Sequence, residues 1–146
     1  MGRLFWAIAL AFIMLLTACE GVRTADPIPT KPLVAQALAL QVQQTQAQLT
    51  QHLRLREAAT DIQITQVKIQ QRSSLPIDDL PGYRVQGTYT VKLALPSHTI
   101  VRRNNPYDLY LQRQREGKTW RLARWQTDEV GDSFWVTQLV PPPTLD

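Results

Sequence analysis

The chain has 146 residues, of which 44% are hydrophobic and 19% charged, and its formal net charge is +4. This length and apolar content fit one domain with a core of its own. With one cysteine, Cys19, the chain has no disulfide framework, and two histidines without a second cysteine argue against a conventional zinc site.

The first nineteen residues have the three parts of a secretory signal peptide. Arg3 supplies a positive start, residues 4–16 form an unbroken apolar run, and small residues precede Cys19. A bilayer-spanning helix needs about 20 apolar residues, so this run is short for a permanent span. An ordinary N-terminal anchor helix with an incidental cysteine is the alternative interpretation.

The tetrapeptide at positions 16–19 resembles the lipobox of bacterial lipoproteins. The resemblance implies that Leu16, Thr17 and Ala18 are recognition positions of a signal peptide that ends at residue 18. It also implies that Cys19 receives a diacylglyceryl group and that its new amine is acylated, typically with palmitate. We therefore expect an extracytoplasmic protein, anchored by lipid at the periplasmic face of the inner or outer membrane or at the cell surface. Nucleic acid is excluded by this location, which leaves the membrane and an unidentified protein as partners.

Residues 19–31 are expected to form a tether, because they contain Gly21, Pro27 and Pro29 and show no periodicity. A long amphipathic helix is predicted from Pro32 to about Ala59, where proline in the first turn costs nothing. Its apolar seam follows helical spacing, and glutamines occupy the other faces. The seam consists of Ala35, Leu38, Val42, Thr45, Leu49 and Leu53. A helix laid across a sheet and a partner-binding coiled-coil helix both fit this pattern.

The next segments alternate with period two, as strands do. A strand is predicted at 61–71 with a bulge near Gln66, followed by a loop at 73–82 that contains two prolines. The clearest strand covers residues 83–95. Gly87 lies within it and indicates a bend or a close approach of the helix.

A polar connection is predicted at 96–106, with a short strand at 99–102. Strands at 106–115 and 118–127 flank Glu116-Gly117, a hairpin signal. A loop at 128–132 and a last strand at 134–140 follow, and Pro141 begins a proline-rich tail that runs to residue 146.

The predicted fold is therefore α+β, with one long N-terminal helix on a curved antiparallel meander of four or five strands, spanning residues 32–140. This order resembles the cystatin-like and NTF2-like folds, in which a curved sheet wraps a helix. Residues 107–111 and 118–122 are similar to the final hairpin of NTF2-like domains. The single helix favours the simpler cystatin-like layout, and the inhibitory Gln-x-Val-x-Gly loop of cystatins is not evident.

Catalytic groups are few. His52 and His98 have no Ser or Asp partner at recognisable spacing, and the carboxylate runs at 78–79 and 128–132 lack the length of a calcium loop. We therefore expect no catalytic residue, no metal and no cofactor. Solvated loops account for both carboxylate runs.

The most suggestive candidate for a binding surface is an exposed patch of Arg121, Arg124 and Trp125. The alternative is that Trp125 packs against Trp135. The sequence thus predicts a non-enzymatic, membrane-tethered protein-binding or assembly module, which docks its partner through the outer face of the sheet and the glutamine-rich helix. A carrier of small apolar ligands is the alternative function, and an enclosed cavity lined by Tyr89 and Trp120 would favour it.

Overall fold

The structure is a computed structural model that describes residues 27–53, 59 and 61–142. The predicted signal peptide, Cys19 and most of the predicted tether lie outside these residues. The described part is an α+β arrangement of one helix and a five-stranded antiparallel sheet. It contains no helix long and apolar enough to cross a bilayer.

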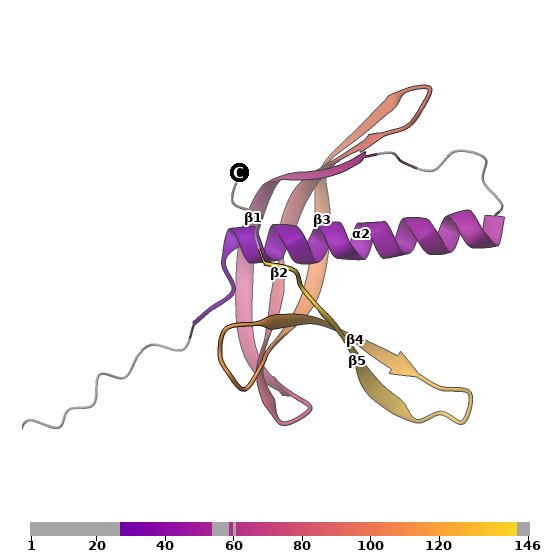
Figure 1. The fold of residues 1–146 in the computed structure, drawn as a ribbon. Coiled ribbons are helices and arrows are strands. Elements are labelled where there is room, and N and C mark those ends of the chain that lie inside the picture. The colour runs from indigo at the N-terminus through magenta and orange to yellow at the C-terminus, as the bar shows by residue number, and fades with distance from the viewer. Residues whose placement is uncertain (1–26, 54–58, 60, 143–146) are drawn as a thin grey trace, which may run out of the picture.

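Helix α2 spans Lys31–Leu53, and the strands are β1 (Asp61–Ile77), β2 (Leu80–Ala94), β3 (Thr99–Arg113), β4 (Trp120–Thr127) and β5 (Ser133–Leu139). The strands lie in the sheet in chain order, so each neighbouring pair is antiparallel. The sheet curls around α2, which crosses its concave side (Figure 1). In this arrangement the apolar side of the helix and the concave face of the sheet cover each other.

The start of α2 agrees with the sequence prediction. Pro32 lies in its first turn, and the backbone N–H of Val34 donates to the carbonyl of Thr30 at 3.0 Å. The described helix ends at Leu53, and Ala59, the predicted end, is not helical. Residues 54–58 lie outside the described part.

The buried side of α2 differs from the predicted seam. Val34, Ala37 and Leu38 are almost fully buried, and Leu38 alone of these belongs to that seam. Val42 is half-buried and Leu49 is 48% exposed. The physical reason is visible in Figure 1, where the second half of α2 runs past the curled middle of the sheet, with the β2–β3 and β4–β5 turns above and below it in this view. Helical spacing identifies an apolar stripe but not how many of its turns another layer covers.

The predicted loop at 73–82 is wrong. Pairing of β1 with β2 continues to Ile77 and Leu80, which leaves Asp78 and Asp79 as a two-residue turn with φ of 45° and 60°. Asp tolerates this left-handed conformation, which tight hairpin turns require. The two prolines, at positions 76 and 81, face each other one step from the turn. In such a hairpin that pair exchanges no ladder hydrogen bond, so the prolines cost none.

The predicted bulge near Gln66 is confirmed. The register between β1 and β2 shifts between Thr65 and Lys68, and Gln66 has a φ of 51°. Gly87 of β2 lies opposite this irregular part of β1, where a Cβ would come within 1.9 Å of the Lys68 carbonyl oxygen. Tyr107 donates its hydroxyl to the same oxygen at 3.1 Å. The glycine therefore admits the backbone of β1 and a tyrosine, not the helix.

The short strand predicted at 99–102 is present, but the polar connection predicted to follow it is wrong, because the strand continues to Arg113 as β3. The turn is confined to residues 95–98, and the N–H of Leu95 donates to the carbonyl of His98 at 2.8 Å. Asn104, with a φ of 55°, accompanies a register shift opposite Tyr89 and Val91. This part of β3 lies mostly on the surface, so its polar composition does not prevent strand formation.

The last three predictions along the chain are confirmed. The hairpin around Glu116-Gly117 closes with a hydrogen bond from Gln114 N–H to the Thr119 carbonyl, and Gly117 has a φ of 74°. Residues 128–132 form the next turn, and β5 follows.

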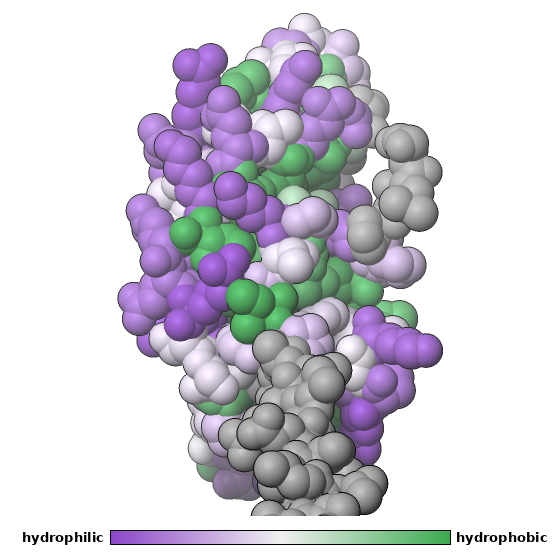
Figure 2. All heavy atoms as spheres, turned by 90° about the vertical axis from the view of Figure 1, so that its left-hand side faces the viewer, coloured by the Kyte–Doolittle hydropathy of each residue, from purple (hydrophilic) through white to green (hydrophobic). Residues whose placement is uncertain are grey.

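The core lies between the first half of α2 and the concave face of the sheet. Its buried members are Val34, Ala37, Leu38, Val85, Tyr107, Leu109, Leu111, Leu122 and Val140. Each fully buried aliphatic side chain contributes roughly 1.5–3 kcal/mol. The face seen along α2 from its N-terminal side has hydrophobic residues gathered in the middle, with hydrophilic residues around them (Figure 2).

Candidate binding groove

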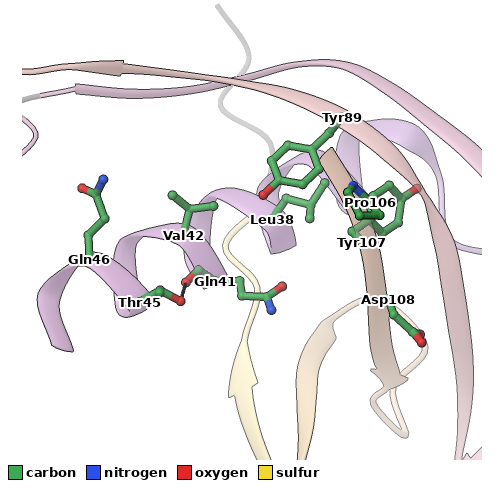
Figure 3. A pocket seen from close by; sticks show the side chains of 9 residues that line it. All are labelled: Leu38, Gln41, Val42, Thr45, Gln46, Tyr89, Pro106, Tyr107 and Asp108. Atoms are coloured by element: carbon green, nitrogen blue, oxygen red, sulfur yellow. Dashed lines mark hydrogen bonds between the residues drawn. The ribbon is translucent and has the colours of Figure 1, made fainter. Parts of the chain in front are cut away.

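An open groove of about 280 Å³ lies between the middle of α2 and β3, and we call it the α2–β3 groove (Figure 3). Its lining residues come from α2, β2 and β3: Leu38, Gln41, Val42, Thr45, Gln46, Tyr89, Pro106, Tyr107 and Asp108. The groove begins where α2 leaves the sheet. Its helical wall therefore starts at the core residue Leu38 and continues along the part of α2 that the core leaves uncovered.

The helical wall is uncharged and the strand side is aromatic. Thr45 donates its hydroxyl to the carbonyl of Gln41 at 2.9 Å, within α2. The rings of Tyr89 and Tyr107 contact edge to face, with centroids 6.2 Å apart. Burial raises the pKa of both phenols, so both stay protonated at neutral pH. The Tyr89 hydroxyl points toward α2 in Figure 3 and has no hydrogen bond within the described part, so it is free for a ligand.

The carboxylate of Asp108 forms an ion pair with Arg84. Arg84 donates from Nε to Oδ1 at 2.9 Å and from Nη2 to Oδ2 at 2.5 Å, and Gln86 Nε2 donates to Oδ2 at 3.1 Å. The hydrogen bonds from Arg84 hold the pKa of Asp108 below its usual value. Asp108 is the strand neighbour of the buried Tyr107 and Leu109, so its carboxylate lies toward the convex face, where Arg84 and Gln86 match its charge.

A second opening adjoins this groove at the point where β3 and β4 separate, and we call it the strand fork. The two strands pair from Tyr110↔Ala123 to Arg113↔Trp120, and beyond these pairs they diverge (Figure 1). The fork has a volume of about 310 Å³ and is lined by Gln41, Asp108, Leu109, Tyr110, Leu122, Ala123, Arg124 and Trp125. Gln41 and Asp108 line both openings, so the groove and the fork adjoin.

The structure divides the three residues of the predicted patch. Arg124 and Trp125 both line the strand fork. Arg124 is two residues from the buried Leu122 and therefore lies on the concave face, whereas Arg121 and Trp125 lie on the convex face. Arg121 is paired with Gln112 and is not part of the fork. The residues do not form one continuous surface, because strand neighbours point to opposite sides of a sheet.

Trp125 also has a packing role on the convex face. The ring centroids of Trp125 and Trp135 are 4.8 Å apart, and those of Trp135 and Tyr110 are 5.0 Å apart. Ala123 lies on the same face and is 2% exposed, which is consistent with cover from these rings. The packing alternative for Trp125 is thus confirmed, although 55% of the residue remains exposed.

The first half of α2 fills only part of the concave side, and openings remain beside the helix. Tyr89 lines the α2–β3 groove, while Trp120 lines a separate depression with Leu33 and Val140. Trp120 also contacts Tyr83, with ring centroids 6.1 Å apart. Among the described residues, Tyr89 and Trp120 therefore line two separate openings, whereas a carrier was expected to have both in the wall of one enclosed cavity.

The other candidate groups lie apart from the groove. His98 is exposed in the β2–β3 turn, with Nδ1 2.9 Å from the hydroxyl of Ser97. Asp128 Oδ1 accepts from the backbone N–H groups of Val130 and Asp132, so this carboxylate holds its own turn. In the described ranges, no group of three or more His, Cys, Asp or Glu is placed to hold a metal ion.

Two glutamines of the helix face that the sequence singled out for docking, Gln41 and Gln46, line the groove, whereas sequence reasoning missed Tyr107 and Asp108. The fork itself results from the point at which two strands stop pairing, and alternation along a strand does not encode that point. No protein-family model, no curated protein and no solved structure matches the chain.

Proposed function

We propose that this chain is an extracytoplasmic lipoprotein, anchored through Cys19, whose α+β domain binds a protein partner and performs no catalysis. The observation that carries the proposal is the open α2–β3 groove beside the uncovered half of α2. A groove open to solvent, with amide, hydroxyl and aromatic groups in its walls, suits a protein segment.

The layout of the domain supports a cystatin-like or NTF2-like assignment. A curled antiparallel sheet around a helix is common to both folds. The single helix that precedes the meander in the described part of the chain favours the cystatin-like form. The fold alone assigns no activity, because function depends on the site that a fold presents.

The anchor is supported by the sequence, in which Cys19 follows an apolar run and the small residue Ala18. Expression of wild type and Cys19→Ala in the host bacterium tests it. The wild type should fractionate with membranes and carry acyl chains at its N-terminus by mass spectrometry. The variant should accumulate as the uncleaved precursor or leave the membrane after cleavage at another site. An unacylated wild type would contradict the anchor.

The binding role is tested by a photocrosslinking amino acid placed at Leu49 in the full-length protein in its host. Leu49 is 48% exposed on the uncovered half of α2, so a partner docked there lies within reach. Gln70, exposed on the edge strand β1, is the matched control position. A discrete crosslinked protein at Leu49 but not at Gln70 is expected. Equal crosslinking at both positions would contradict the proposal.

Transport of small apolar ligands is a second candidate, favoured by Leu38, Val42 and Tyr89 in the lining of the groove. Native mass spectrometry of protein extracted from membranes distinguishes it. A carrier should retain a small hydrophobic molecule that a Val42→Gln variant loses. A protein-binding module should show no such adduct.

A further inference from the structure

Two arginines on the concave face lie near the groove along the strands: Arg102 is four residues before Pro106 on β3, and Arg124 lines the adjoining strand fork. Arg102 pairs with Val91, which in turn pairs with the core-packed Ile64, so Arg102 shares their face. Arg124 lies on the same face at the strand fork. Neither guanidinium has an ion pair or a hydrogen bond within the described residues. Since Arg84 already matches the charge of Asp108, the surface near the groove carries uncompensated positive charge.

The groove also runs along a free strand edge. β4 pairs with β3 only from Tyr110 onward, so residues 99–109 of β3 have no neighbour on that side within the described part. Asn104, with its positive φ, and Pro106, without an N–H, interrupt this edge. The continuous free edge next to the groove is therefore residues 107–109. Such a short edge admits one added segment while discouraging open-ended sheet growth.

We propose that the α2–β3 groove and the strand fork receive an extended, acidic peptide segment of the partner protein. Carboxylates of the segment pair with Arg102 and Arg124, and its main chain bonds to the edge at residues 107–109. An apolar or aromatic side chain of the segment rests against Tyr89 and Val42. This inference rests on the proposed protein-binding function and specifies the chemistry of the partner.

A second copy of this chain fits the groove less well. A symmetric contact between two copies places the same patch on both sides, so Arg102 and Arg124 would face their equivalents. Like charges brought together at an interface disfavour that contact. The partner that complements the groove therefore carries negative charge, which identical copies of this surface lack.

The test uses the full-length chain in detergent micelles and a displayed library of random 12-residue peptides. Selected peptides should be enriched in Asp and Glu and depleted in Lys and Arg relative to the unselected library. One selected peptide, fluorescently labelled, is then titrated against wild type and two double variants by anisotropy. The first is Arg102→Glu with Arg124→Glu. The second, Lys92→Glu with Arg121→Glu, changes the net charge equally but on the convex face, because Lys92 is the strand neighbour of Val91.

We expect the first double variant to bind about tenfold more weakly, or worse, and the second to stay within about twofold of wild type. Added salt should weaken binding to the wild type. Absence of an acidic bias overturns the inference, and so does equal weakening in both double variants. If sedimentation shows concentration-dependent dimers that the first double variant abolishes, the groove binds a second copy of the chain, and the peptide inference is overturned. Partner crosslinking at Leu49 without acidic selection would leave the proposed function intact and refute the acidic peptide alone.

Discussion

The two halves of α2 have similar amphipathic sequences and very different surroundings. In the first half, Val34, Ala37 and Leu38 are buried against the sheet. In the second half, Val42 is partly covered and Leu49 is 48% exposed. One half closes the core, and the other forms a wall of the α2–β3 groove.

The difference shows that a helix longer than the layer it covers can serve as both core and binding surface. The first half derives its stability from burial, which makes it intolerant of substitution. The second half is held by the helix that continues from the first and does not depend on its own side chains. Substitutions should therefore separate stability from binding according to the half of the molecule in which they lie.

The largest expected effect comes from Leu38→Ala. Leu38 is 1% exposed in the core, and its truncation should lower the free energy of unfolding by about 2–5 kcal/mol. Leu49→Ala, the same chemical change in the uncovered half, should stay within about 0.5 kcal/mol of wild type. Urea titration of the full chain in mild detergent measures both. Similar losses for the two variants would mean that the second half of α2 is covered as well.

Gly87→Ala should be nearly as severe. A Cβ at this position would lie 1.9 Å from the Lys68 carbonyl oxygen, so β1 and β2 would have to separate at the bulge. We expect a loss of about 3 kcal/mol. Gly117→Ala is the control, because its Cβ would meet no atom within 4 Å and only its φ of 74° is unfavourable. About 1 kcal/mol is expected there, and a larger loss at Gly117 than at Gly87 would contradict the role assigned to the β1–β2 contact.

The sequence predicted the elements well wherever one physical signal dominated. Period-two alternation identified β2, and Glu116-Gly117 identified the β3–β4 turn. The sequence failed where composition and geometry disagree. Pro76 and Pro81 indicated a loop, yet they occupy strand positions that need no N–H. The polar residues before Pro106 likewise indicated a loop, although a strand on the surface can be polar.

The site was less predictable than the fold. Trp125 and Arg124 were singled out by residue type, and both line the strand fork, but on opposite faces. Tyr107 and Asp108 enter the groove because β3 and β4 stop pairing at Tyr110, a tertiary event without a local sequence signal. The buried stripe of α2 depended in the same way on where the sheet ends.

Two glutamines allow the same comparison between a buried and an exposed side chain. Gln112 is 4% exposed beside the β1–β2 turn, and its Nε2 donates to the carbonyl of Ile77 at 2.9 Å. Gln86, in contrast, donates to the exposed carboxylate of Asp108. Gln112→Ala should cost about 1–3 kcal/mol, because it removes a buried hydrogen bond together with the packing of a side chain that is almost fully buried. Gln86→Ala should cost under about 0.5 kcal/mol, and thermal unfolding of both variants ranks them.

A small effect that depends on pH is expected from the exposed ion pair Arg84–Asp108. Its side chains are 44% and 39% exposed, so Asp108→Asn should cost no more than about 1 kcal/mol at neutral pH. Since folding lowers the pKa of Asp108, the carboxylate stabilises the fold above its unfolded pKa of about 4. This contribution disappears as the pH falls through the lower folded pKa. The difference in unfolding free energy between wild type and Asp108→Asn should therefore shrink between pH 7 and pH 3. Arg84→Gln should remove the same pH dependence, since the hydrogen bonds of Arg84 are its main cause, and a difference that grows at low pH would contradict this account.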